Sequence, residues 1–209
     1  MQFTPRQVWG LAVEADRING GYCKVDVYAH TLDVVQKQAN KSMVKQWLRQ
    51  GRVPSQADAE EGLRVRHYFN GFLLKQISGK INEFEQQALR IAQMEEFAGN
   101  HMLEFAIVSC LPSTMRRDQE ANNVARDIRE STQLVGAVGD TVQGQVEIVK
   151  CFYSIAYNKY RITAKLVDSF VDFWYNKDLA KGDRVEIRGK IKTCRGDNTT
   201  QLNYVKMTS

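Results

Sequence analysis

The side chains best suited to binding another molecule lie in the last third of the chain, where aromatic and basic residues are interleaved. They are Tyr153, Tyr157, Lys159, Arg161, Lys165, Trp174, Lys192 and Arg195. Aromatic rings stack on the bases of single-stranded nucleic acids at about 1–3 kcal/mol per base, whatever the base. Lysine and arginine neutralise phosphates. These residue types predict a contact surface for single-stranded DNA or RNA, with little sequence preference.

Sequence patterns of catalysis and metal binding are missing from the chain. There is no Gly-x-x-x-x-Gly-Lys-Ser/Thr phosphate loop and no Gly-x-Ser-x-Gly nucleophile motif. The four cysteines form no Cys-x-x-Cys pair, and the three histidines are scattered. A zinc site needs clustered ligands, so we expect no metal, no cofactor and no enzymatic activity.

The charge of the chain is unevenly distributed. Residues 1–132 hold 17 basic against 16 acidic residues, whereas residues 133–209 hold 12 against 8, a net of +4. This excess favours a polyanionic partner for the C-terminal third. Hydrophobic content of 43% is ordinary for a globular protein, and neither a signal peptide nor a transmembrane stretch is visible. We therefore expect a soluble, cytoplasmic protein without a membrane partner.

Two parts of the chain must position these side chains, and the first is predicted to be helical. Thr4 and Pro5 are typical of a helix start, and Gly20 with Gly21 ends that helix. Residues 22–29 are compatible with either a short strand or the start of the next helix. Further helices are expected at residues 31–50, 55–77, 81–112 and 113–131. This helical domain, residues 1–132, is also a candidate surface for protein partners.

The second part, residues 133–209, shows the two-residue hydrophobic period of β-strands. Gly136 and Gly139 mark the change of period. Strands are expected at residues 141–153, 160–167, 170–175, 182–192 and 199–207. The fold class is therefore α+β, with an N-terminal helical domain followed by a five-stranded β-barrel.

The faces of the second and third strands decide which side chains reach solvent. Arg161 and Lys165 alternate with inward-facing apolar residues, so they are expected to point outward. The third strand is apolar on both faces, and only one face can belong to the core. Asp172 between Phe170 and Trp174 indicates the wetter face, which predicts that Trp174 points outward.

The C-terminal third resembles an OB-fold domain. The resemblance lies in the five short strands, in Gly144 within the first strand, in the Gly182-Asp183 turn and in Gly189 of the fourth strand. OB-folds bind ligands on strands two and three and on the loops that join strands one to two and four to five. The resemblance implies roles for Arg161, Lys165 and Trp174 on the strands. In the loops it implies roles for Tyr153, Tyr157, Lys159, Lys192 and Arg195, beside Gly196 and Asp197. The chain departs from the family at residues 176–182, which are too few for the helix that many OB-folds carry there.

Three functions follow as hypotheses. The first is a non-sequence-specific single-stranded nucleic-acid-binding protein, accessory to replication, recombination, repair or transcription. The second is a protein-interaction or assembly module, for example in a virion or larger complex, whose barrel binds no nucleic acid; OB-like barrels serve in this way too, and fold alone does not decide function. The third is an enzyme with a site built from both domains, for which the sequence indicates no residue.

Overall fold

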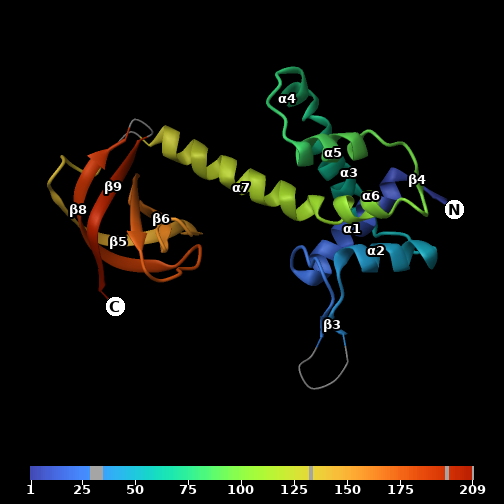
Figure 1. Cartoon of the computed structure of the whole chain (residues 1–209), viewed down its shortest axis with the longest axis horizontal. Helices are drawn as coiled ribbons and strands as arrows, with labels where there is room; N and C mark the ends of the chain where they lie inside the picture. Colours follow the sequence, from blue (N-terminus) through green and yellow to red (C-terminus); the bar gives the residue numbers. More distant parts are fainter. Residues whose placement is uncertain (29–34, 132–133, 196–197, 209) are drawn as a thin grey trace. The chain divides into compact units, whose positions relative to one another are not determined.

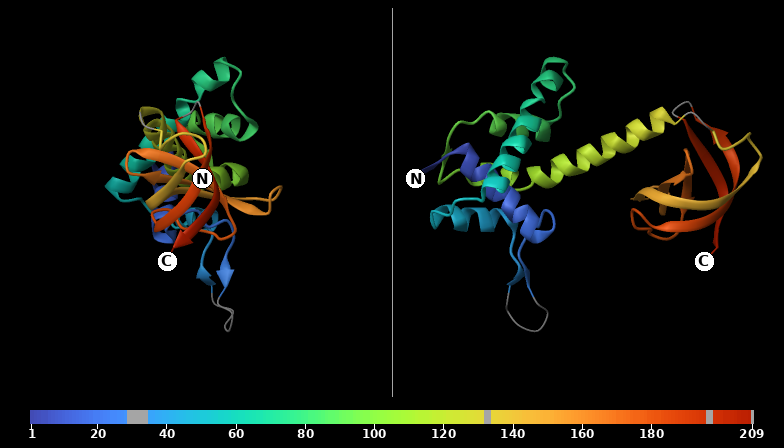
Figure 2. Two further views of the ribbon diagram at one scale, coloured as in Figure 1. Left: turned by 90° about the vertical axis from the view of Figure 1, so that its left-hand side faces the viewer. Right: turned by 180° about the vertical axis from the view of Figure 1, so that it is seen from behind.

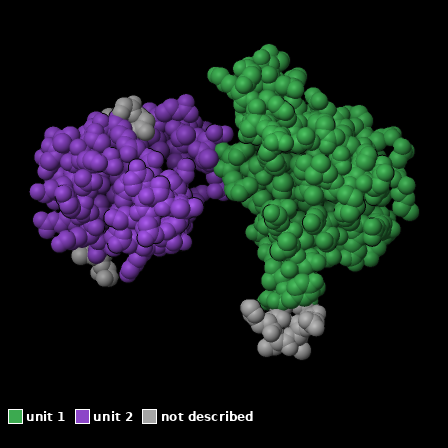
Figure 3. All heavy atoms as spheres, in the orientation of Figure 1, with its two compact units in different colours: residues 1–119 green, residues 120–209 purple. Residues whose placement is uncertain are grey.

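A computed structural model describes residues 1–28, 35–131, 134–195 and 198–208. The chain divides into two compact units, residues 1–119 and 120–209, which Figure 3 shows in different colours. We call them the helical unit and the barrel unit. The division falls inside the long helix α7 (Leu111–Glu130). The domain boundary predicted near residue 133 coincides with residues 132–133, which lie outside the described residues, and it stays a prediction.

The helical unit consists of short helices and two small two-stranded sheets (Figure 1). Its helices before α7 are α1 (Pro5–Asn19), α2 (Asn40–Arg49), α3 (Gln56–Asn70), α4 (Leu73–Ile77), α5 (Glu83–Ala92) and α6 (Met102–Val108). Its paired strands are β1 (Gln2–Phe3) with β4 (Phe97–Ala98), and β2 (Val27–Tyr28) with β3 (Val35–Lys37). Among the described residues, no helix is long and apolar enough to cross a membrane.

The predicted ends of the first helix are confirmed. The Thr4 hydroxyl accepts a hydrogen bond from the backbone N–H of Gln7 at 3.3 Å, and Pro5 lies in the first turn. Gly20 ends α1 in the left-handed conformation, at φ 62°. Both features satisfy backbone groups that a helix end leaves without partners.

The helical unit has its own core, and a glycine permits the closest helix crossing in it. A Cβ at Gly62 of α3 would lie 2.6 Å from backbone atoms of Trp9 and Gly10 in α1. The absence of a side chain at residue 62 therefore lets α1 and α3 approach. The largest side chains buried around this crossing are Trp9, Leu11, Phe69, Ile91, Phe97, Phe105 and Leu111.

The helix predicted at residues 31–50 is wrong in its first part. Only residues 40–49 are helical, residues 35–37 form β3, and residues 29–34 lie outside the described residues. Hydrogen bonds from elsewhere in the chain hold the base of this hairpin. The Asp26 carboxylate accepts from the N–H of Ala39 at 2.7 Å, and the buried Asn40 side chain binds backbone groups of Cys23 and Gly21.

Two other helical predictions are corrected. The helix expected at residues 55–77 breaks at Gly71, where α3 ends and the short α4 follows. The helix expected at residues 81–112 consists of α5, the strand β4 and α6. Pro112 lies in the first turn of α7 instead of ending a helix, a position where the missing proline N–H costs nothing.

The barrel unit contains the five predicted strands, β5 (Thr141–Ser154), β6 (Lys159–Leu166), β7 (Ser169–Tyr175), β8 (Arg184–Cys194) and β9 (Thr199–Thr208). They form a closed barrel in the order β5-β6-β7-β9-β8, in which β7 and β9 are parallel. Figure 2 shows the barrel from two further sides. The predicted fold class, helical region followed by a five-stranded barrel, is confirmed.

The barrel core confirms the predicted inward faces. Val146, Ile148, Ile162 and Phe173 are each no more than 1% exposed and belong to one cluster. The connection between β7 and β8 carries no helix, as its length predicted. The opposite faces of β5, β6 and β7 are the surface on which the predicted binding residues must be located.

Candidate nucleic-acid interface on the barrel

A row of three side chains crosses the outer face of the barrel. Phe152 of β5 pairs with Arg161 of β6, and Arg161 pairs with Trp174 of β7. Residues directly opposite each other in antiparallel strands lie on the same face of a sheet. The two neighbours of Arg161 along β6 are core or half-buried residues, so this row faces away from the core. We call this surface the outer row.

The turn between β5 and β6 adds a second ring to Trp174. The rings of Tyr157 and Trp174 have centroids 4.7 Å apart and are tilted by 44°. Tyr157 is 67% exposed, and Trp174 is half-buried. Phe152, at the other end of the row, is 42% exposed. Aromatic surface is therefore available to solvent at both ends of the outer row.

Phe152 and Lys150 were missed by the sequence reasoning. In the first half of β5 the even-numbered residues Val142, Val146 and Ile148 point inward. The register shifts between Ile148 and Lys150, which marks a β-bulge. One extra residue reverses the faces of the strand, so Lys150 and Phe152 point outward. The Lys150 ammonium lies 5.9 Å from the Phe152 ring centroid. A lysine at an inward position of the alternation was the signal that could have revealed the bulge.

Asp172 holds the arginines of the site. Its Oδ2 accepts hydrogen bonds from Arg161 Nε at 2.9 Å and Nη2 at 2.5 Å, and from Arg195 Nη1 at 3.1 Å. Its Oδ1 accepts from the Thr163 hydroxyl at 2.7 Å. Asp172 is only 3% exposed, which corrects the expectation that it faces solvent. Asp172 is buried because two guanidinium groups cover its carboxylate. Trp174 nevertheless lies on the outer face, where it pairs with Arg161.

This arrangement fixes the charge and the position of both arginines. Two guanidinium groups around one carboxylate leave a net charge of +1 on the cluster. The side chains of Arg161 and Arg195 remain 35% and 32% exposed. Since the carboxylate restrains them, little side-chain entropy is left to lose when they contact an anion. The structure thus brings the predicted residues Arg161, Arg195, Trp174 and Tyr157 into one cluster.

Lys165 is separated from that cluster. It shares the outer face of β6 but lies four residues from Arg161, a separation of about 13 Å along a strand. It pairs with Glu147, which also forms an ion pair with Arg184 at 3.4 Å. The neighbouring carboxylate lowers the positive potential around Lys165.

The residues predicted to bind from the first loop lie on different sides of the β5–β6 hairpin. The Tyr153 ring packs against Tyr160, with centroids 5.2 Å apart, and its hydroxyl donates to Asn158. Tyr160 packs on the barrel core, so this pair lies on the side of the hairpin opposite Phe152. Lys159 is exposed at the start of β6. The two loop tyrosines therefore do not form one surface.

The second predicted loop is only partly described. Lys192 is exposed in β8, at a point where the register with β9 shifts. Arg195 reaches Asp172, whereas Gly196 and Asp197 lie outside the described residues. Asn198 donates a hydrogen bond to the Arg129 carbonyl of α7 at 3.1 Å, which ties this loop to the helix that precedes the barrel.

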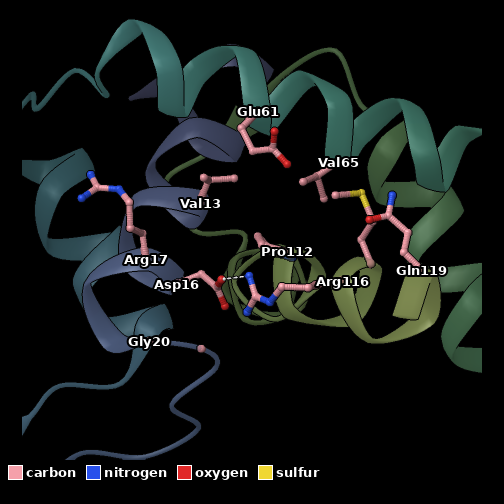
Figure 4. Close-up of a pocket in the computed structure, with 11 residues that line it drawn as sticks. Val13, Asp16, Arg17, Gly20, Glu61, Val65, Pro112, Arg116 and Gln119 are labelled. Carbon is pink, nitrogen blue, oxygen red and sulfur yellow. Dashed lines mark hydrogen bonds and ion pairs between the residues drawn. The ribbon is translucent and has the colours of Figure 1, made fainter. Parts of the chain in front are cut away.

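A hollow of about 530 Å³ in the helical unit is a second candidate site (Figure 4). Its charged lining residues are bonded to other side chains. The buried Asp16 accepts from Arg116 at 2.8 Å and from the Ser113 hydroxyl, and Arg17 pairs with Asp58 at 2.9 Å. Asp16 thereby fastens the first turns of α7 to α1. These contacts give the hollow's charges a structural role.

Metal-binding and cysteine chemistry have little support in the described part of the chain. Within that part, no group of three histidine, cysteine or acidic side chains is placed to hold a metal ion. Cys23 is buried, and Cys110, Cys151 and Cys194 are half-buried free thiols.

Neither a scan against protein-family models nor a search of curated protein sequences finds a match to this chain.

Proposed function

We propose that the barrel is an OB-fold and that it binds single-stranded DNA or RNA without sequence preference. The observation that carries this proposal is the outer row Phe152–Arg161–Trp174, with Tyr157 packed on its tryptophan. In the order of the chain, the closed barrel runs one-two-three-five-four, and its second and third strands carry most of the row. These are the strands on which OB-folds hold oligonucleotides.

The chemistry of the row suits a flexible polyanion with planar bases. Each exposed ring offers about 1–3 kcal/mol of stacking to a base, and Arg161 and Lys150 lie beside the rings to meet phosphates. No side chain in the row is arranged to distinguish one base edge from another. The role we propose is accessory and non-enzymatic, inside the cell, in replication, recombination, repair or transcription.

Tryptophan fluorescence gives a direct test. The chain has three tryptophans, of which Trp9 is fully buried and Trp47 is 9% exposed in the helical core. Titration with a short oligo-dT should therefore change the emission through Trp174. Trp174→Ala should weaken binding by about 1–3 kcal/mol, or roughly 5- to 150-fold, in the anisotropy of a labelled oligonucleotide.

The matched control is Tyr204→Ala, which removes an aromatic ring that is 83% exposed on β9, outside the outer row. Its affinity should stay within twofold of the wild type. Unchanged fluorescence and anisotropy at 50 mM salt, with the folded state intact, would refute the proposal.

A separate observation favours a protein partner for the helical unit. Leu74 and Ile77 of α4 are 75% and 76% exposed, and Leu73 and Phe84 beside them are more than 40% exposed. We propose that α4 contacts another protein, in line with the expectation that the helical domain offers a surface for protein partners, whereas the alternative hypothesis gives an assembly role to the barrel. Light scattering of the purified protein distinguishes the two: a defined oligomer without affinity for oligo-dT favours assembly alone.

A further inference from the structure

The basic side chains of the helical unit differ in whether they form ion pairs. Seven of them form ion pairs with acidic side chains, namely Arg17, Arg52, Arg64, Arg66, Lys75, Arg90 and Arg116. In the described part of the chain, Lys41, Lys45 and Arg49 of α2 form none. We call these three residues the α2 basic row.

The α2 basic row lies on one side of its helix. Residues four apart on a helix are neighbours, about 6 Å apart along the axis. The buried face of α2 is made by Met43, Val44, Trp47 and Leu48, and the row runs beside it. Burial lowers the pKa of Lys45, and the neighbouring positive charges of Lys41 and Arg49 lower it further.

The local sequence concentrates positive charge around this row. Residues 22–54 hold six basic and two acidic residues, a net of +4, whereas the remainder of residues 1–119 holds nine basic and eleven acidic residues, a net of −2. The helix α2 itself contains three cations and no acidic residue. Lys41 lies in its first turn, where the helix dipole disfavours a cation. Arg49, in contrast, lies in the last turn of α2, where the dipole favours a cation. Helix stability therefore accounts for Arg49 but not for Lys41.

The row is held on a firm base. Asn40, at the start of α2, is fully buried, and its side-chain oxygen accepts from Asn19 Nδ2 at 2.7 Å and from the N–H of Cys23 at 2.9 Å. These bonds fasten α2 and the β2–β3 hairpin to the end of α1. The hairpin projects from the helices in Figures 1 and 2 and adds the exposed Lys37 next to α2.

We infer that the α2 basic row is a second nucleic-acid contact, which binds the phosphate backbone of the strand that the barrel holds. This inference rests on the proposed function for the choice of nucleic acid over an acidic protein. The three cations span about 12 Å along α2. Among the described residues none of them forms an ion pair, although Lys45 Nζ donates to Met102 Sδ at 2.9 Å, so the row can meet successive phosphates and contribute affinity without base preference. This contact is separate from the barrel, and a strand longer than the barrel alone covers can reach it.

The test compares a short with a long oligonucleotide on the full chain. An OB-fold covers roughly 4–16 nucleotides, so labelled dT10 reports on the barrel, and dT60 reports on both contacts. The variant K41Q/K45Q/R49Q should bind dT10 within twofold of the wild type. Its affinity for dT60 should fall at least tenfold at 50 mM salt, and the slope of log K against log salt should weaken by about 2.

The control variant R6Q/K80Q/R117Q removes the same charge from exposed cations of the helical unit outside α2. It should change dT60 binding by less than threefold. Circular dichroism must show the same thermal midpoint for both variants and the wild type.

The possible results distinguish failure of the α2 contact from failure of the barrel site. Equal losses in the two triple variants, or none in either, overturn the α2 contact, while dT10 binding preserves the barrel proposal. Binding of dT60 that depends on α2, without dT10 binding, supports the α2 contact and refutes the barrel site. If the wild type binds neither oligonucleotide, both proposals are wrong. Polyglutamate is tested in the same way as a model of an acidic protein. If it binds through the α2 basic row more tightly than dT60 does, the partner of this row is an acidic protein and the inference of a nucleic-acid contact is wrong.

Discussion

The ring of Tyr157, in the turn between β5 and β6, packs against the ring of Trp174 on β7. A side chain from a loop is thus held on the outer face of the sheet by an aromatic contact. Aromatic pairs of this kind contribute about 0.5–1.5 kcal/mol beyond the burial of their area. The contact holds the loop beside the strands that carry the outer row, so both rings are already in position in the absence of a ligand.

Of the two neighbours Phe152 and Tyr153, only Phe152 should contribute to binding. Phe152→Ala removes a ring from the outer row and should weaken oligo-dT binding by about 1–3 kcal/mol. Tyr153→Ala removes a ring that packs on Tyr160 at the other side of the hairpin, so affinity should stay within about threefold. Anisotropy titrations of both variants measure this. Equal losses would show that the hairpin binds as a whole, without a preferred face.

Asp172→Asn should destabilise the barrel. It removes the charge that Arg161 and Arg195 share and leaves two cations close together. Breaking a buried pair in this way costs about 3–5 kcal/mol, and partial exposure of both arginines reduces the loss to about 2–4 kcal/mol. Urea unfolding provides the measurement. The exposed Asp168, exchanged for asparagine, is the control and should change the free energy of unfolding by less than about 0.5 kcal/mol.

Lys150 and Lys165 should differ in the salt dependence of binding. Lys150 lies beside the Phe152 ring, so Lys150→Gln should reduce the slope of log K against log salt by about 0.7, the value for one phosphate on a single strand. Lys165 faces Glu147 at the far end of β6, and Lys165→Gln should leave the slope unchanged. The measurement is the affinity for oligo-dT at salt concentrations from about 50 to 200 mM, the range over which phosphate contacts weaken strongly. The reverse ranking would place the ligand at the Glu147 end.

Stability should fall in acid through Asp58. A hydrogen bond from Arg17, together with one from Ser55, lowers the pKa of Asp58 from its ordinary 3.8, against the effect of burial. Because the folded state has the lower pKa, this carboxylate stabilises the fold above about pH 3.8, and the contribution is lost as the pH falls through the folded value. Urea unfolding of the wild type and Asp58→Asn should show a difference at pH 7 that narrows below pH 3.8. The control is Glu96→Gln, which changes an exposed carboxylate. The difference in unfolding free energy between this variant and the wild type should be the same at pH 7 and below pH 3.8.

Gly62→Ala should destabilise the helical unit although alanine favours helices. The added methyl group would meet backbone atoms of Trp9 and Gly10 at 2.6 Å, and backbone cannot rotate away as a side chain does. Overpacking of this kind costs about 1–3 kcal/mol, more than the helix propensity that alanine returns. Chemical denaturation should show the loss. The exposed Glu60→Ala on the same helix should stay within about 0.5 kcal/mol of the wild type.

Periodicity located the five strands, and the resemblance to an OB-fold led to the prediction that they form a barrel. The strand positions and the inward face of β6 followed from two-residue alternation. That pattern left the face of β7 open, because this strand is apolar on both sides, and the choice made from Asp172 rested on a side chain that is in fact buried. The pattern did not show the bulge at Val149, because one extra residue changes the face without changing the composition. Phe152 was therefore overlooked. The short strand that was one of two alternatives for residues 22–29 is present as β2, but its partner β3 was predicted to be helical. Hydrogen bonds of the Asp26 and Asn40 side chains across the base of this hairpin favour the strands over a helix.

The sequence by itself determined the α+β class, the strands of the barrel and the residue types able to bind a strand of bases, because hydrophobic period and side-chain chemistry are local properties. Only the tertiary structure decided which of those residues meet. Register brings Phe152, Arg161 and Trp174 into one row, and Asp172 lies between two arginines that are 34 positions apart in the chain. Pairing across strands depends on contacts between distant residues, which no pattern along the chain records.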